Sequence, residues 1–225
     1  MTEPTNTKEK IKMSDKINEI NVLEDIEWMS LRWHNAPDKA MPRLLLIGDS
    51  IVAGHGDKVH ALLKENICVD FFATSKHVTN SQFMSDLDFM LHKRSYELIL
   101  FNNGLHGFGI DDKYYKPALF EALSVLKTKT PCLCWRNSTP MLNSENLNEF
   151  NADRNPGVIS RNSDAADVAA SLNLPSLDLY TPMAENKSLF SPDAVHYTQE
   201  GQKAQAELIA DFVVSTLELN NRMYC

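Results

Sequence analysis

Short runs of apolar residues recur from residue 43 onward, and stretches with apolar residues at helical spacing lie between them. Continuous apolar runs of this length are typical of strands that are buried on both faces of a sheet. We predict strands at residues 43–48, 67–72, 96–102, 131–136 and 176–180. We predict helices at residues 51–65, 81–92, 114–127, 159–172 and 199–219. This alternation indicates an α/β fold in which helices cover both faces of a parallel sheet.

The part of the chain before residue 43 has a different pattern. Residues 1–13 are polar and lack periodicity, so we expect them to be disordered. Residues 14–33 carry apolar side chains at roughly helical spacing and are predicted to form a helix, which either packs on the edge of the domain or forms a dimer contact. The predicted organisation is a tail and helix over residues 1–42 and one domain over residues 43–225.

Two segments between the predicted elements carry turn-forming residues instead of a clear periodicity. Residues 143–157 are rich in asparagine and contain a Pro-Gly pair, which favours a loop, with a short helix as the alternative. Residues 181–192 are also interpreted as a loop.

The composition limits which binding partners and which cellular compartment are expected. The net charge of −8 and the pI near 5.3 argue against nucleic acid or an anionic membrane as the main partner. No apolar run approaches the length of a transmembrane helix, and the N-terminus has no apolar signal core, so we expect a cytoplasmic protein. The four cysteines form no CxxC pair and are interpreted as small buried side chains in a reducing compartment.

The first candidate for chemistry is Gly48-Asp49-Ser50, directly after the first predicted strand. Gly48 can adopt backbone angles closed to other residues, so the chain can turn sharply there. Ser50 would then lie beyond the carboxyl end of the strand, which is where ligands bind in open parallel sheets. Two interpretations stay open from this stretch alone. Ser50 is a nucleophile, or Asp49 and Ser50 are ordinary helix N-cap residues.

A second candidate lies just before the last predicted helix, where Asp193 precedes His196 by three residues. An aspartate at this spacing can hydrogen-bond Nδ1 of the imidazole, which leaves Nε2 free to take a proton from a serine. An aspartate in a turn beside a surface histidine is the alternative for this motif in isolation. Because a parallel sheet sends both loops to the same edge, the pairing with Ser50 favours the catalytic interpretation.

Together the two motifs resemble those of the SGNH (GDSL-like) hydrolases, which are flavodoxin-like α/β enzymes that cleave acyl esters. The resemblance covers residues 43–216 and implies a three-layer sandwich with about five parallel strands. It implies that Ser50 is the nucleophile, that His196 is the general base and then the acid, and that Asp193 orients His196. Asp49 is expected to be structural. The Gly-x-Ser-x-Gly motif of the α/β-hydrolases is absent.

The chain departs from the family pattern at the expected oxyanion hole. The family uses the nucleophile's amide, a glycine amide after the second strand, and an asparagine side chain after the third. No glycine follows the second strand here, and we assign that donor to the amide of Ser75. The loop after the third strand reads Asn103-Gly104-Leu105-His106, a variant similar to that of some carbohydrate O-acetylesterase relatives. Either Asn103 or His106 is the predicted donor.

Three further features have weaker functional interpretations. Gly48, Gly54 and Gly56 lack the spacing of a dinucleotide-binding fingerprint, which argues against that function. His55 either lines the pocket or is a surface residue. Residues 136–140 follow the fourth predicted strand at the same sheet edge and are a candidate substrate contact.

We therefore predict a serine esterase that hydrolyses a small acyl ester, with acetyl and carbohydrate esters suggested by the resemblance. Neither a metal ion nor an organic cofactor is implied, and a homo-oligomer is possible through the N-terminal helix. An acyltransferase with the same triad is an alternative because both reactions share the acyl-enzyme. A non-catalytic binding module that keeps the fold is a second alternative, which the altered oxyanion loop would favour.

Overall fold

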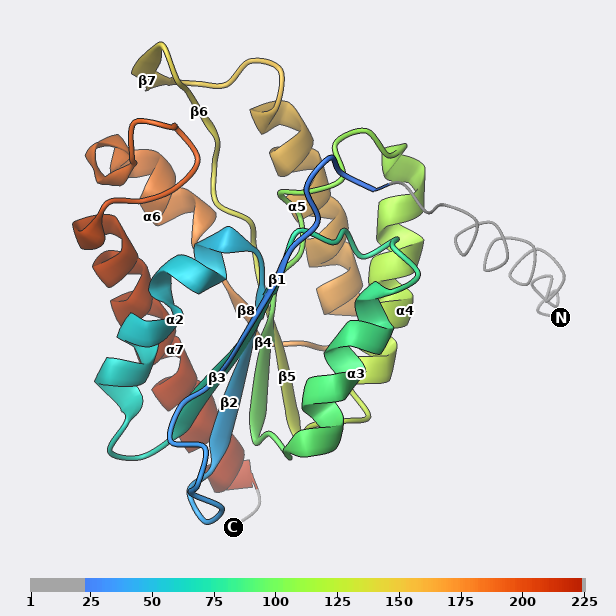
Figure 1. The fold of residues 1–225 in the computed structure, drawn as a ribbon, viewed down its shortest axis with the longest axis vertical. Helices are drawn as coiled ribbons and strands as arrows, with labels where there is room; N and C mark the ends of the chain where they lie inside the picture. The colour runs from blue at the N-terminus through green and yellow to red at the C-terminus, as the bar shows by residue number, and fades with distance from the viewer. Residues whose placement is uncertain (1–22, 224–225) are drawn as a thin grey trace, which may run out of the picture.

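The computed structural model describes residues 23–223, which form a central sheet between two layers of helices (Figure 1). The sheet contains six strands in the order β1-β3-β2-β4-β5-β8. Their bounds are β1 Met29–Trp33, β2 Arg43–Gly48, β3 Cys68–Thr74, β4 Leu98–Phe101, β5 Cys132–Arg136 and β8 Ser176–Leu177. The five strands of this sheet other than β1 pair in parallel, which confirms the predicted sheet.

The order of the parallel strands decides where a ligand can bind. β2 is the first of them in the sequence, and it lies between β3 and β4, as in flavodoxin-like folds. The chain therefore changes direction across the sheet at β2, and the crevice outside the carboxyl end of this strand is the expected binding place. That end carries Gly48 and leads to Ser50.

Helices cover both faces of the sheet, as predicted. The helices are α2 Ser50–Leu63, α3 Phe83–Lys93, α4 Tyr115–Leu126, α5 Asn155–Ser171, α6 Tyr180–Glu185 and α7 Gln199–Met223, with short 3₁₀ turns at Asp112–Tyr114 and Lys187–Leu189. Helices α3, α4 and α5 share one hydrophobic cluster with alternate β2 residues Leu45 and Ile47. Helices α2 and α7 share another with Leu44 and Leu46, on the opposite face. β2 is thus buried on both sides, as its unbroken apolar run indicates.

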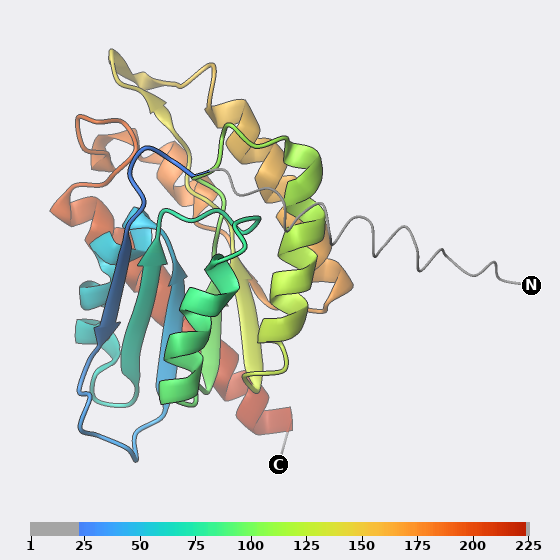
Figure 2. The ribbon, with the colours of Figure 1, turned by 45° about the vertical axis from the view of Figure 1, so that its right-hand side comes forward.

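The predicted N-terminal helix over residues 14–33 is wrong where the structure describes it. Residues 29–33 form β1, which pairs antiparallel with β3 at the edge of the sheet, as Figure 2 shows. Leu31 and Trp33 pack against the cluster that contains Leu45 and Ile47. These two apolar residues are two positions apart, which is the period of a strand. Pairing with the free edge of β3 outweighs the helical spacing of the longer segment. Residues 14–22 of the prediction lie outside the described residues.

The segment predicted as a loop over residues 143–157 contains more regular structure than expected. A small hairpin of β6 Leu142–Asn143 and β7 Asn146–Phe150 lies there. Helix α5 then begins at Asn155, with a proline in its first turn, where the missing N–H costs no helical hydrogen bond. Helix α6 likewise lies in a stretch interpreted as a loop.

Between residues 23 and 223 no helix is long and apolar enough to cross a membrane. The described side chains also contain no group of three or more histidine, cysteine, aspartate or glutamate residues that could hold a metal ion.

Candidate active site

The turn between β2 and α2 presents Ser50 as the first residue of a helix. Asp49 is the N-cap, and its Oδ1 accepts the amide of Ile51 at 2.9 Å. The Asp49 side chain therefore does the capping, and the Ser50 hydroxyl is not needed for it. Gly48 does not have the positive φ that its place in the sequence suggested; a glycine is needed there for space, since a Cβ would lie 2.5 Å from Cγ2 of Val52. As the first helical residue, Ser50 also has an amide with no acceptor inside the helix.

The hydroxyl of Ser50 instead hydrogen-bonds the imidazole of His196. Nε2 of His196 lies 2.7 Å from Oγ of Ser50, and Nδ1 lies 2.9 Å from Oδ2 of Asp193. A carboxylate only accepts hydrogen bonds, so Nδ1 carries the proton and Nε2 accepts from the serine. The side chains of Asp193 and His196 are 53% and 46% exposed, so this chain of hydrogen bonds is open to solvent and to a substrate.

Backbone contacts hold Asp193 and His196 in this arrangement. Oδ1 of Asp193 accepts the amides of Val195 at 3.0 Å and His196 at 2.8 Å, and the Ser191 amide donates to the His196 carbonyl. Ala194 adopts a positive φ of 66°, which lets the loop turn tightly enough for these contacts. Partial burial raises the pKa of Asp193, but the two amides and the imidazole outweigh it and lower the pKa overall. Asp193 therefore stays ionised as the partner of His196.

The loop after β4 also lies at this edge of the sheet. The Asn103 side chain in this loop already makes two hydrogen bonds to the backbone of the loop after β3. Its Nδ2 donates to the Lys76 carbonyl at 3.0 Å, and its Oδ1 accepts the Val78 amide at 3.0 Å. Asn103 thus joins the loop after β3 to the loop after β4. Gly104 has little room for a side chain, since a Cβ would lie 2.3 Å from Oγ of Ser138.

His106 is held by a carboxylate from the segment before β1. Glu24 accepts from Nδ1 of His106 at 2.9 Å and from the amide of Gly107 at 2.9 Å. The ring of Trp28 also meets the His106 ring edge-on at 6.2 Å between centroids. With Nδ1 donating to Glu24, Nε2 of His106 can donate only when the ring is protonated.

Ser75 is already engaged by the same segment. Its amide donates to the carbonyl of Trp28 at 3.2 Å, and its hydroxyl donates to Glu27 at 2.6 Å. The amide that the sequence prediction assigned to an oxyanion is thus used to extend the pairing between β1 and β3.

Arg161 on α5 fixes the backbone of the loop that carries His106. It is 2% exposed and donates to the carbonyls of Gly104 at 3.2 Å, His106 at 2.6 Å and Gly107 at 2.9 Å. Its Nε donates to Asp112 at 2.8 Å. Sequence reasoning missed this arginine and Glu24, because neither lies in a motif or at a strand end.

Two other candidates from the sequence are buried. His55 packs between α2 and α7, where its Nδ1 contacts Oε1 of Gln205 at 2.9 Å. Burial, with a smaller effect from the charge of Arg136, lowers the pKa of His55 to about 3, so the ring is neutral. Arg136, the first residue of the candidate substrate-contact stretch over residues 136–140, is only 1% exposed, so its side chain is not open to solvent.

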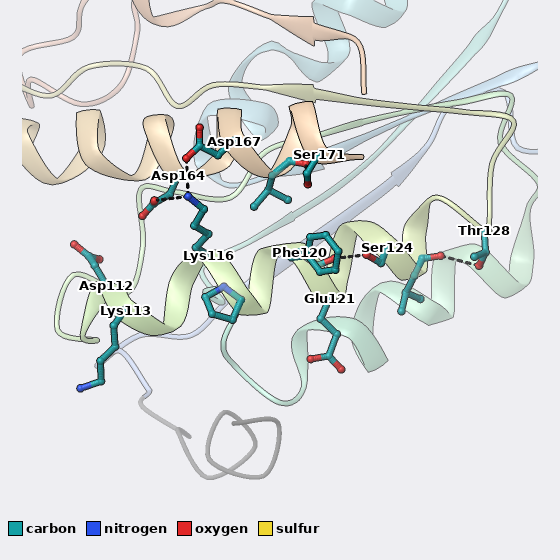
Figure 3. A pocket seen from close by; sticks show the side chains of 13 residues that line it. Asp112, Lys113, Lys116, Phe120, Glu121, Ser124, Thr128, Asp164, Asp167 and Ser171 are labelled. Atoms are coloured by element: carbon teal, nitrogen blue, oxygen red, sulfur yellow. Dashed lines mark hydrogen bonds and ion pairs between the residues drawn. The ribbon is translucent and has the colours of Figure 1, made fainter. Parts of the chain in front are cut away.

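A large open groove lies elsewhere, between α4 and α5, with a volume of about 1000 Å³ (Figure 3). Lys116 points between Asp164 and Asp167 and makes ion pairs with both. The hydroxyls of Ser124 and Ser171 donate to carbonyls of their own helices, and the lining contains no histidine. The groove therefore offers no nucleophile and base comparable to the pair at the β2 edge.

Searches of protein-family models and of curated proteins find no match to the chain. Solved structures do match. A GDSL-like lipase from Bacteroides thetaiotaomicron is 19% identical, with 77% of this chain and 88% of that chain covered and a TM-score of 0.61. A putative acylhydrolase from Bacteroides fragilis is 18% identical, with 80% and 90% covered and a TM-score of 0.62.

An acetylxylan esterase from Geobacillus stearothermophilus is 14% identical, with 76% of this chain and 94% of that chain covered and a TM-score of 0.61. At these identities the comparisons show the fold. The chain has the three-layer α/β fold of GDSL-like hydrolases, which confirms the fold that the sequence motifs implied.

Proposed function

We propose that the protein is a serine esterase in which Ser50, His196 and Asp193 form the catalytic triad. The observation that carries the proposal is the continuous chain of hydrogen bonds from Ser50 Oγ through His196 to Asp193, at 2.7 Å and 2.9 Å. Its position at the carboxyl end of β2, on a fold shared with lipases, acylhydrolases and acetylxylan esterases, supports the same function. In the acetylxylan esterase from Geobacillus, a serine-to-alanine substitution gives a catalytic mutant.

The reaction follows from the protonation states of the triad. Oγ of Ser50 attacks the carbonyl carbon of the ester while Nε2 of His196 takes the hydroxyl proton. The imidazolium, stabilised by Asp193, then gives this proton to the leaving alkoxide, and an acyl-enzyme remains. Water attacks the acyl-enzyme with His196 again as the base, which releases the acid and restores the serine.

The negative charge on the tetrahedral intermediate needs hydrogen-bond donors. We expect the Ser50 amide to be one of them, because it begins α2 and lies at the positive end of the helix dipole. The second donor comes from the loop after β4, from Asn103 or His106. One N–H of the Asn103 amide group is used by Lys76, so its other N–H is the one that an oxyanion would take.

A short acyl group, acetyl in particular, is the substrate class that we propose, with a carbohydrate as the leaving alcohol. This follows from the acetylxylan esterases among the structures with the same fold and from the Gly-Leu-His variant of the loop. The test is a panel of p-nitrophenyl esters from acetyl to octanoyl together with acetylated xylose and glucose. We expect the highest kcat/KM for acetyl esters, and a preference for the octanoyl ester would contradict the short-acyl assignment.

A further inference from the structure

The first strand of the β6–β7 hairpin lies against the turn between Asp193 and His196. The amide of Leu142, the first residue of β6, donates to the carbonyl of Ala194 at 2.8 Å. The hairpin follows β5 and so lies at the carboxyl edge of the sheet, and Figure 1 shows it beside the loop that leads into α7. This hydrogen bond therefore joins the hairpin to the residue next to Asp193.

The contact fixes one particular peptide group of the turn. The carbonyl of Ala194 and the amide of Val195 belong to the same peptide. Its carbonyl accepts from Leu142, and its amide donates to Oδ1 of Asp193 at 3.0 Å. Oδ2 of the same carboxylate contacts Nδ1 of His196 at 2.9 Å. The orientation of this peptide therefore bears directly on the orientation of the imidazole.

The backbone of Ala194 needs contacts from outside the turn to keep its conformation. Its φ of 66° is in the left-handed region, which is unfavourable for a residue with a Cβ. Such conformations persist where the surrounding structure fixes them. The Ala194 amide donates to the Ser191 carbonyl at 3.0 Å, and the Leu142 amide holds the carbonyl on the other side. The hairpin thus supplies one of the two backbone contacts of the strained residue.

The side chain of Leu142 links the same turn to the segment that carries the nucleophile. Leu142 is 1% exposed and belongs to a small hydrophobic cluster that also contains Ile51 and Tyr197. Ile51 directly follows Ser50 in the sequence. Tyr197 directly follows His196. The residues after the nucleophile and after the base therefore share one cluster with Leu142.

Asn155, at the start of α5, holds the hairpin in this place. It is 3% exposed, its Oδ1 accepts the Met141 amide at 3.0 Å, and its Nδ2 donates to the Tyr180 hydroxyl at 2.9 Å. The Met141 carbonyl accepts the amide of Asn151 at 2.9 Å. The residue before Leu142 is therefore held at both its N–H and its C=O, and one buried amide joins the hairpin to α5 and α6.

We propose that Leu142 and Asn155 are positioning residues that hold the turn of residues 193–196 at the distance from Ser50 that proton transfer needs. The inference rests on the proposed function. Leu142 acts through the Ala194 carbonyl, and Asn155 acts by fixing the chain before Leu142. When the hairpin shifts, the peptide after Ala194 is free to turn, and the carboxylate that orients the imidazole loses a fixed partner.

The first test compares Asn155→Ala with Asn155→Asp on p-nitrophenyl acetate. Alanine leaves the Met141 amide without its acceptor. We expect it to lower kcat by about 10²-fold with KM within twofold, because a displacement of about 1 Å at the reacting groups costs this much in rate. Aspartate keeps oxygens for the Met141 amide and the Tyr180 hydroxyl, and should recover kcat to within about tenfold of wild type, on the same scale. Asn146→Ala, at the exposed start of β7, is the matched control and should be fully active.

The second test compares Leu142→Ala with Leu142→Met. Alanine keeps the backbone amide but leaves a cavity in the cluster, so we expect kcat to fall by about tenfold, less than for a full 1 Å displacement, with KM within twofold. Methionine has a similar volume and should recover most of the loss. Thr130→Val is the control for general destabilisation. It removes a buried hydroxyl that donates to the Tyr96 carbonyl at the amino end of β5, and should lower stability while kcat stays unchanged.

The outcomes separate this inference from the proposed function. If Asn155→Ala is not folded by circular dichroism, the two Leu142 variants carry the test. An active wild type whose folded alanine variants keep their kcat would overturn this inference alone. Losses that neither conservative variant recovers would overturn it as well. A wild type with neither turnover nor serine labelling would overturn the proposed function, and this inference with it.

Discussion

Nε2 of His196 lies 2.7 Å from Oγ of Ser50, although 146 residues separate the two in the sequence. The packing of α7 on α2 brings them together, since His55 contacts Gln205 and Lys58 donates to Gln202 across these helices at 2.9 Å each. The loop before α7 therefore returns to the end of the first parallel strand. The hydrogen bond between Ser50 and His196 therefore depends on how distant parts of the chain pack together.

Substitution in the triad separates catalysis from folding. We expect Ser50→Ala and His196→Ala each to lower kcat/KM for an acetyl ester by about 10⁴-fold or more, and Asp193→Asn by about 10²–10⁴-fold. The Asp193 variant loses less because Oδ1 can still accept the amides that shape the loop. Ser124→Ala in the α4–α5 groove is the control and should be fully active. Equal activity of Ser50→Ala and wild type would refute the assignment.

The second oxyanion donor can be identified by graded substitutions. Removing such a donor typically costs about 10²–10³-fold in kcat. If His106 is the donor, His106→Ala shows this loss while His106→Asn, which keeps an N–H group, recovers part of it. If Asn103 is the donor, Asn103→Ala shows the loss and His106→Ala does not. Steady-state kinetics on one acetyl ester distinguish the two.

The segment before β1 is expected to affect activity through His106. Glu24→Gln removes the carboxylate that accepts from His106 and Gly107. We expect a fall in kcat of about tenfold with a small change in the unfolding free energy, because the contact between His106 and Glu24 is partly exposed. Glu65→Gln, an exposed substitution in the turn after α2, is the control. A Glu24 variant that matches the control would show that this contact has no part in the reaction.

Arg161 is expected to contribute to the stability of the protein as well as to the conformation of the loop that carries His106. Arg161→Met leaves three carbonyls and Asp112 without their donor, and we expect it to lower the unfolding free energy by about 3 kcal/mol. Urea denaturation followed by circular dichroism measures the change. A loss below about 1 kcal/mol would mean that the loop is held by its other contacts.

Stability should fall with acidification because of buried neutral histidines. Burial lowers the pKa of His55 and His77 to about 3 each. Between pH 6.5 and 3 the unfolded chain therefore binds a proton on each that the folded protein does not, so acid favours unfolding. Each histidine contributes a slope of up to about 1.4 kcal/mol per pH unit. His55→Gln should lower the slope of unfolding free energy between pH 6 and 4.5, and an unchanged slope would contradict the assignment.

The fold could be predicted from the strands that are buried on both faces. Their apolar runs are unbroken, as in β2, so these segments could be assigned as strands without knowledge of distant contacts. β1 could not be predicted in the same way. Its residues become a strand only because the edge of β3 is free to pair with them, and that edge is not visible in the local sequence.

For the candidate site, the sequence predicted the residues that lie in motifs. Ser50, Asp193 and His196 lie at a strand end and before a helix, where position alone suggests chemistry. Glu24 and Arg161 lie in no motif, and they contact the loop after β4 from parts of the chain that are far from it in the sequence. Their roles follow only from three-dimensional contacts.

The most direct test of the central claim is labelling with a serine-directed fluorophosphonate, followed by intact-mass spectrometry and peptide mapping. The triad predicts one adduct per chain, on Ser50, in the wild type and none in Ser50→Ala. His196→Ala should label far more slowly, because the base that activates the hydroxyl is gone. A folded wild-type protein that takes up no label, or that is labelled at another serine, would contradict the account.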